Sequence, residues 1–127
     1  RRKHMMNSHE IEIFLSKHPT TRKYFIGVFA SDKMPKLKDR HFPYCFVANT
    51  DRAGTIGEHW VACFVNSPTE IEYFDSLGDY PNEDLSSYLN LFERILINDR
   101  IVQHQFSDAC GQFCIYFLTQ RCSGILY

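Results

Sequence analysis

The chain has 127 residues, of which 44% are hydrophobic and 15% aromatic, and its 14 Lys and Arg residues nearly balance 15 Asp and Glu. This length suits one compact domain with its own hydrophobic core, so we expect residues 1–127 to form a single domain. The formal net charge of -1 excludes an overall attraction to nucleic acid or to an anionic membrane. No apolar run approaches the roughly 18 residues that a membrane span needs.

The five cysteines include no Cys-x-x-Cys pair. An odd number of cysteines without such a pair is typical of a reducing compartment and not of a disulfide scaffold. We therefore expect an intracellular protein, and the pattern does not distinguish the nucleus from the cytoplasm. We also expect a monomer that uses no cofactor and binds no metal.

A short helix is predicted near the N-terminus. The basic residues that open the chain indicate a disordered tail over 1–6. Asn7 or Ser8 can cap the helix, and His18 ends it because a residue before Pro19 avoids helical backbone angles. The apolar side chains that share one face of this helix are Ile11, Phe14 and Leu15.

Four apolar runs of strand length follow the helix. They cover residues 24–29, 44–49, 59–65 and 71–75. The second run is continuously apolar, which indicates a strand buried on both faces. The last two runs are close enough in sequence to form a hairpin.

Two further helices are predicted in the C-terminal half. One begins after Asn82 and repeats apolar residues at helical spacing as far as Leu96. The other begins near Cys110 and ends before Gly124. The order of elements predicts an α+β fold, in which helices pack against a small, mainly antiparallel central sheet.

The predicted hairpin brings a histidine and an aspartate to the same end of two strands. His59 opens one strand and Asp75 closes its neighbour. A three-residue connection between the strands would place His59 opposite Leu77, on the same face as Asp75. A two-residue connection would turn Asp75 to the opposite face, so the sequence leaves both registers open.

Cys110 completes a set of residues suited to nucleophilic catalysis. A thiol needs a nearby imidazole, and preferably a helix N-terminus, to become a thiolate at neutral pH. His59 can supply the imidazole, and Asp75 can fix its tautomer. A side-chain amide, from Gln103 or Gln105, can join the Cys110 backbone N–H in stabilising an oxyanion.

Each of these residues also has a structural explanation. Asp75 can cap a turn before Gly78, and His104 is a rival base because it lies near Cys110 in the sequence. A zinc site would need partners for Cys110 and Cys114 that the spacing does not offer. The cysteines that lie in apolar runs, and are expected to be buried hydrophobic residues, are Cys45, Cys63, Cys114 and Cys122.

Three segments, taken in order, resemble the adenain and ubiquitin-like-protease clan of cysteine peptidases. GEHWVACFV is similar to the histidine strand of the clan, EYFDS to its acidic strand, and QHQFSDACGQFCIYFL to its nucleophile helix. Within the clan the chain resembles the adenain-like proteases of adenoviruses and of Polinton or Maverick transposons. YFIGVFASDKMP and VANTD resemble the transposon group in particular. The resemblance implies a papain-like, adenain-like fold with the nucleophile at the N-terminus of a central helix.

By position, the resemblance implies Cys110 as nucleophile, His59 as general base, Asp75 as orienting acid and Gln103 as oxyanion donor. The ubiquitin-like proteases place their Gln one residue nearer to the cysteine, where this chain has His104, so Gln105 remains an alternative. The resemblance also implies that Trp60 packs beside the site. The given sequence does not include the C-terminal part that adenoviral enzymes carry after this helix, so the resemblance leaves open whether a peptide or DNA activates this protein.

The resulting expectation is a cysteine endopeptidase with a polypeptide substrate, which processes virion-like precursor proteins of a transposon or virus. Two alternatives of enzyme type share the same residues: a protease that removes ubiquitin-like modifiers, and an acetyltransferase. The third alternative is a binding module that keeps the fold without catalysing a reaction.

Overall fold

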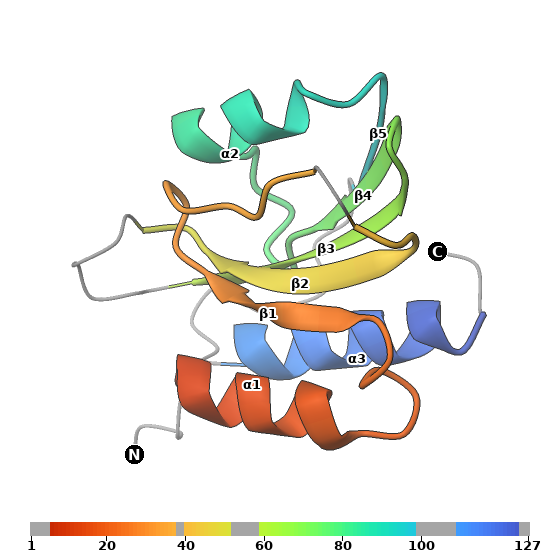
Figure 1. Cartoon of the computed structure of the whole chain (residues 1–127). Helices are drawn as coiled ribbons and strands as arrows, with labels where there is room; N and C mark the ends of the chain where they lie inside the picture. The colour runs from red at the N-terminus through yellow and green to blue at the C-terminus, as the bar shows by residue number, and fades with distance from the viewer. Residues whose placement is uncertain (1–5, 38–39, 52–58, 99–108, 125–127) are drawn as a thin grey trace, which may run out of the picture.

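The computed structural model describes residues 6–37, 40–51, 59–98 and 109–124. Within these ranges the chain forms helices packed against one sheet (Figure 1). In chain order the elements are α1 (Ser8–Lys17), β1 (Phe25–Phe29), β2 (Tyr44–Asn49), β3 (Trp60–Ser67), β4 (Glu70–Phe74), α2 (Glu83–Leu89), β5 (Arg94–Ile97) and α3 (Cys110–Cys122).

The strands lie side by side in the order β1-β2-β3-β4-β5. The pairs β2–β3 and β3–β4 are antiparallel, whereas β1–β2 and β4–β5 are parallel. The sheet of the described residues is therefore mixed, not mainly antiparallel as predicted. The long connections after β1 and β4 explain the difference, because a parallel pair needs a crossover that a tight hairpin cannot provide.

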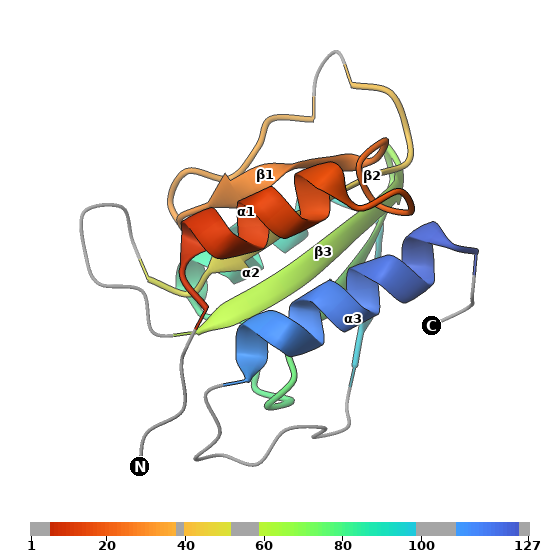
Figure 2. The ribbon, with the colours of Figure 1, turned by 90° about the horizontal axis from the view of Figure 1, so that it is seen from below.

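The helices cover both faces of this sheet. Helices α1 and α3 lie along one face, and α2 lies on the other (Figures 1 and 2). Side chains along β3 point alternately to the two faces of the sheet. Trp60 and Phe64 therefore pack toward α1 and α3, whereas Val61 and Val65 pack toward α2. The α+β prediction is confirmed.

Helix α1 begins where the sequence predicted. The Asn7 side chain accepts a hydrogen bond from the Glu10 backbone at 2.9 Å, and the Glu10 carboxylate accepts one from the Asn7 backbone at 2.9 Å. This capping box satisfies two N–H groups that the helix itself leaves without partners. Ile11 and Leu15 are fully buried, but Phe14 is 43% exposed and stacks on His18 at the end of the helix.

The predicted helix after Asn82 is wrong in its second half. Asn82 caps α2 as expected, with its side chain accepting from the Leu85 backbone at 3.0 Å, but the helix ends at Leu89. Residues 94–97 form β5, which pairs with β4. Pairing satisfies backbone groups at the edge of β4, and this gain outweighs the helical spacing of the apolar side chains.

The first described residue also departs from the prediction. The sequence predicts a disordered tail that includes Met6, but the Met6 carbonyl accepts a hydrogen bond from the Trp60 indole at 3.0 Å, and Met6 packs against the core. Residues 1–5 lie outside the described ranges. Among the described helices, none has the length and apolar character needed to cross a bilayer.

Candidate functional site

The hairpin of β3 and β4 has the register that unites His59 and Asp75. Ala62 pairs with Phe74, and the same register, extended to the strand ends, places His59 opposite Leu77. The turn is tight, but a bulge over residues 65–67 adds one residue to β3. The pairing is therefore the one predicted for a three-residue connection.

His59 and Asp75 form a close hydrogen bond at this end of the sheet. The distance from His59 Nε2 to Asp75 Oδ1 is 2.6 Å, and the two side chains are 14% and 3% exposed. Asp75 Oδ1 also accepts from the Leu77 backbone N–H at 2.9 Å. The carboxylate is thus fixed on its own turn while it orients the imidazole.

Cys110 is near enough to His59 to act on the pKa of its imidazole. It is buried, and it is the first residue of α3. Burial lowers the pKa of His59, but hydrogen bonds and charge interactions with Asp75 and Cys110 outweigh it and raise that pKa to about 9. Because Nε2 is bonded to Asp75, Nδ1 is the ring nitrogen left for the thiol.

The start of α3 suits a negative charge. No side chain caps this helix at Ala109. The first N–H groups of a helix carry a partial positive charge, which favours an anion such as a thiolate. The structure therefore places a thiol, an imidazole and a carboxylate in series at a helix N-terminus.

The N-terminal segment packs beside this site. A Cβ on Gly111 would lie 3.1 Å from Met6 Cβ and 3.3 Å from Ile11 Cδ1. The absence of a side chain at Gly111 thus lets the start of the chain approach the helix that carries Cys110. Trp60, which bonds to Met6, belongs to the same buried cluster as Cys110.

The predicted oxyanion donors lie outside the described residues. These are Gln103 and its alternative Gln105, and the rival base His104 is also outside. Of the other cysteines, Cys63 and Cys114 are fully buried, and desolvation raises the pKa of each thiol. Among the residues with described positions, no group of three or more His, Cys, Asp and Glu side chains is arranged to hold a metal ion.

The sequence analysis missed Asn98, which bonds to both backbone groups of Asp75. Asn98 Oδ1 accepts from the Asp75 N–H at 2.9 Å, and Asn98 Nδ2 donates to the Asp75 carbonyl at 2.7 Å. The signal was its place directly after the apolar residues of β5. Because the sequence predicts a helix over those residues, it gives no indication that Asn98 lies at the edge of β4.

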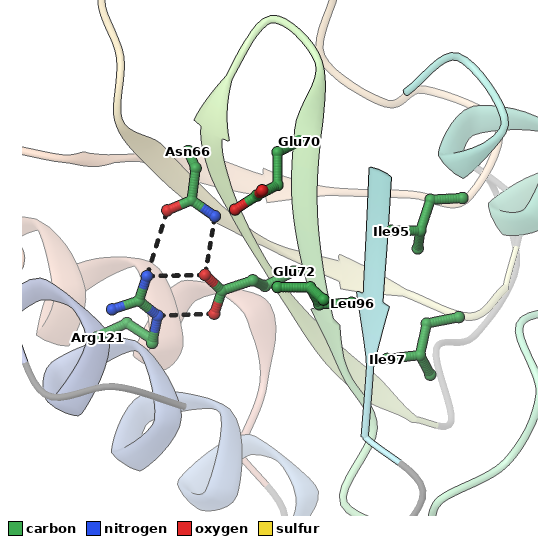
Figure 3. A pocket seen from close by; sticks show the side chains of 7 residues that line it. All are labelled: Asn66, Glu70, Glu72, Ile95, Leu96, Ile97 and Arg121. Carbon is green, nitrogen blue, oxygen red and sulfur yellow. Dashed lines mark hydrogen bonds and ion pairs between the residues drawn. The ribbon is translucent and has the colours of Figure 1, made fainter. Parts of the chain in front are cut away.

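A second polar cluster lies at the opposite end of α3. Arg121 donates to both Glu72 oxygens, at 2.6 and 2.7 Å, and Asn66 bridges the two side chains (Figure 3). The Arg121 guanidinium also lies 4.3 Å from the centre of the Phe64 ring. A cavity of about 700 Å³ opens beside this cluster, next to β5. Every charge in the cluster is paired, which indicates a structural role.

The comparisons with known proteins point to viral cysteine proteases. A SUMO-1 cysteine protease of African swine fever virus is 28% identical over 94 residues, which cover 64% of this chain and 34% of the viral protein. A protease of bovine adenovirus C serotype 10 is 29% identical over 106 residues, covering 65% of this chain and 54% of that protein. No protein-family model matches the chain.

The same relationship is visible in the fold. The crystal structure of an African swine fever virus protease matches 97% of this chain and 59% of its own, with a TM-score of 0.71 at 16% identity. This match confirms the predicted adenain-like fold. The chain spans about a third to a half of the length of the curated relatives named above.

Proposed function

We propose that the protein is a cysteine endopeptidase in which Cys110 is the nucleophile, His59 the general acid and base, and Asp75 the orienting acid. The observation that carries the proposal is the 2.6 Å bond from His59 to Asp75. The buried Cys110, at the start of α3, raises the pKa of the same imidazole. Kinship with viral cysteine proteases supports it.

In the first half of the reaction, the imidazole takes the thiol proton and the Cys110 sulfur attacks the scissile carbonyl carbon. A carbon–sulfur bond forms, and the carbonyl oxygen becomes an oxyanion. As the tetrahedral intermediate collapses, the carbon–nitrogen bond breaks and the His59 imidazolium donates its proton to the leaving amine. The raised pKa of His59, about 9, keeps this proton available at neutral pH.

In the second half, water hydrolyses the acyl-enzyme. His59 takes a proton from water, the hydroxyl oxygen attacks the acyl carbon, and the carbon–sulfur bond breaks to release the carboxylic acid. The Cys110 backbone N–H, at the open start of α3, is suited to stabilise both oxyanions. We assign the side-chain donor to Gln103, with Gln105 as the alternative.

The proposed substrate is a polypeptide, and the proposed role is the processing of virion-like precursor proteins. The viral origin of the relatives supports this role. The closer kinship with Polinton or Maverick transposon proteases stays a prediction, since the relatives named above come from viruses.

A second candidate function is the removal of a ubiquitin-like modifier. It is favoured by the name of the African swine fever virus relative, a SUMO-1 cysteine protease. A SUMO-1 vinyl sulfone probe tests it directly. Covalent labelling of Cys110 by this probe, absent with a ubiquitin probe, would favour deconjugation over precursor processing.

The first test of the proposal is the reactivity of Cys110 toward iodoacetamide between about pH 5 and 9. The experiment uses a Cys122→Ala background, because contact with Cys45 lowers the pKa of Cys122 and makes it a competing target. We expect Cys110 to react at low pH, as a thiolate paired with an imidazolium does. Cys63 and Cys114 serve as internal controls, since burial raises the pKa of both.

The matched variants are His59→Ala and His18→Ala. His18 lies at the end of α1, where it caps the helix and stacks on Phe14. The low-pH reactivity should vanish in His59→Ala and persist in His18→Ala. A Cys110 that titrates as an ordinary thiol in the parent protein would contradict the proposal and favour a binding module.

A further inference from the structure

We propose that Asn98 is a positioning residue for the site, holding the backbone of Asp75 so that its carboxylate stays within hydrogen-bonding reach of His59. The inference rests on the proposed function, because it assigns a role in the same reaction. The side-chain hydrogen bonds described for Asn98 both go to the Asp75 backbone, so Asn98 acts on the site through Asp75.

The two bonds from Asn98 replace a missing strand partner. Strand β4 ends at Phe74, so Asp75 lies just beyond the regular ladder. Asp75 is 2% exposed, and a buried N–H without an acceptor destabilises the folded state. The Asn98 carboxamide supplies an acceptor for this N–H and a donor for the carbonyl, as a neighbouring strand would.

Strand β5 delivers Asn98 to this position. The pairing of β5 with β4 runs to Tyr73 and Ile97, and the Asn98 backbone N–H then donates to the Tyr73 carbonyl at 3.4 Å. Asn98 follows directly after β5 along this edge, and its side chain therefore reaches Asp75. A residue 23 positions away in the sequence is thereby tied to the acid.

The backbone of Asp75 controls its carboxylate through a tight turn. The Asp75 carbonyl accepts from the Gly78 N–H at 2.8 Å, and Gly78 has a φ of 68°, which favours glycine. Oδ1 is held by the Leu77 N–H. With the main chain clamped by Asn98, this turn leaves Oδ1 aimed at His59. A displacement of about 1 Å at such a contact reduces catalysis strongly.

Asn98 also lines a cavity of about 330 Å³, together with Gly78, Asp79, Tyr80 and Ile97. The same residue thus borders this cavity and bonds to Asp75. Truncation at Asn98 would extend the cavity toward the Asp75 backbone. Water could then replace the carboxamide, and a hydrated turn holds its carboxylate less firmly.

The test compares Asn98→Ala with Asn82→Ala. Asn82 makes the same two kinds of bond, since its Nδ2 donates to the Thr50 carbonyl at 2.7 Å and its Oδ1 accepts from the Leu85 N–H at 3.0 Å. Both variants therefore lose at least one donated and one accepted bond to backbone. Asn98→Ala loses them at Asp75 itself, whereas Asn82→Ala loses them at Thr50 and Leu85.

The first readout is the titration of His59 by NMR, which needs no turnover. The titratable groups that act on His59 are Asp75 at the end of β4 and Cys110 on α3. We expect Asn98→Ala to lower the His59 pKa by about one unit, because a weaker bond from Asp75 supports the imidazolium less. Asn82→Ala should leave it unchanged. An unshifted titration in Asn98→Ala would overturn the inference.

The second readout is peptide hydrolysis. We expect Asn98→Ala to lower kcat about 10-fold with little change in KM, as for an interaction made in the transition state. Equal losses in Asn98→Ala and Asn82→Ala would reduce Asn98 to a structural residue. If the parent protein hydrolyses nothing, the proposed function fails, whereas the His59 titration still decides the role of Asn98.

An isosteric variant covers the case in which Asn98→Ala does not fold. Asn98→Asp keeps an acceptor for the Asp75 N–H but places a carboxylate oxygen against the Asp75 carbonyl. We expect kcat to fall while the His59 pKa rises above about 9, because the added negative charge favours the imidazolium. A His59 pKa and a kcat that both match the parent protein would overturn the inference.

Discussion

Two largely buried ion pairs lie near the two ends of α3; they look alike and differ in chemistry. Each pair joins an acid from the β4 segment to a cationic side chain: Glu72 to Arg121 at the C-terminal end of the helix, and Asp75 to His59 at the N-terminal end. Each contains a bond of 2.6 Å. The difference lies in whether the cation can give up its proton.

The ion pair at the Arg121 end keeps a fixed protonation state. A guanidinium does not lose its proton in a protein, and its fork fits both Glu72 oxygens. Hydrogen bonding to Glu72 raises the pKa of Arg121 further. The guanidinium also donates to the Asn66 side-chain oxygen and lies over the Phe64 ring. This pair fixes α3 against the sheet.

The His59 end is built to change its protonation. An imidazole can hold or release a proton within the working pH range, and here a thiol as well as a carboxylate acts on its pKa. Asp75 lies one residue beyond β4, on a turn, whereas Glu72 lies within the strand. The comparison teaches that one strand can supply a static pair from its middle and a titratable pair from its end.

The largest expected effect is at Cys110, in peptide hydrolysis. Cys110→Ala should lower kcat/KM by about 10³-fold or more, because the variant lacks the thiol that forms the acyl-enzyme. Cys122→Ala, at the other end of the same helix, should retain activity. Hydrolysis by Cys110→Ala at the parent rate would show that Cys110 is not the nucleophile, and the two ends of α3 would then not differ in function.

The next effect is on stability, at the Arg121 end. Arg121→Met leaves the Glu72 carboxylate buried without its partner, and we expect the free energy of unfolding to fall by about 3–5 kcal/mol. Denaturant titration measures this change. The double variant Arg121→Met with Glu72→Leu should recover most of the loss, since it removes both charges. A single variant as stable as the parent would show that the pair does not fix α3.

The same acid-to-amide change at both ends separates their roles. Asp75→Asn should lower kcat/KM by about 10²-fold, because the amide supports the imidazolium poorly. Glu72→Gln should lower the unfolding temperature and leave kcat/KM of the folded protein near the parent value. Equal kinetic losses in the two variants would mean that the ends do not differ in function.

The smallest effect follows from pH. The pKa of His59 is raised from 6.5 to about 9, so the folded state holds this proton more tightly than the unfolded state. The contribution of the pair to stability is complete below about pH 6.5 and is lost as the pH rises through about 9. Activity should fall over the same high-pH range. Asp75→Asn should move this fall to lower pH, whereas Glu72→Gln should leave it in place.

Local patterns in the sequence were enough for several elements. Asn7, one of two predicted capping residues, marks the start of α1, and the four predicted apolar runs coincide with β1 to β4. The residues that meet at the start of α3 were identified from residue type and order, helped by the family resemblance. The signals for the helix start and for the strands each lie within a few residues, so tertiary contacts hardly alter them.

Tertiary structure decided what depends on distant neighbours. Residues 94–97 have helical spacing and become a strand because the edge of β4 offers hydrogen-bond partners. The sequence allows two registers for the hairpin of β3 and β4, and the bulge over residues 65–67 determines which one forms. Asn98 belongs to the site only because β5 pairs with β4. The physical reason is the same throughout: a backbone hydrogen bond needs a partner, and a local sequence does not say which distant segment supplies it.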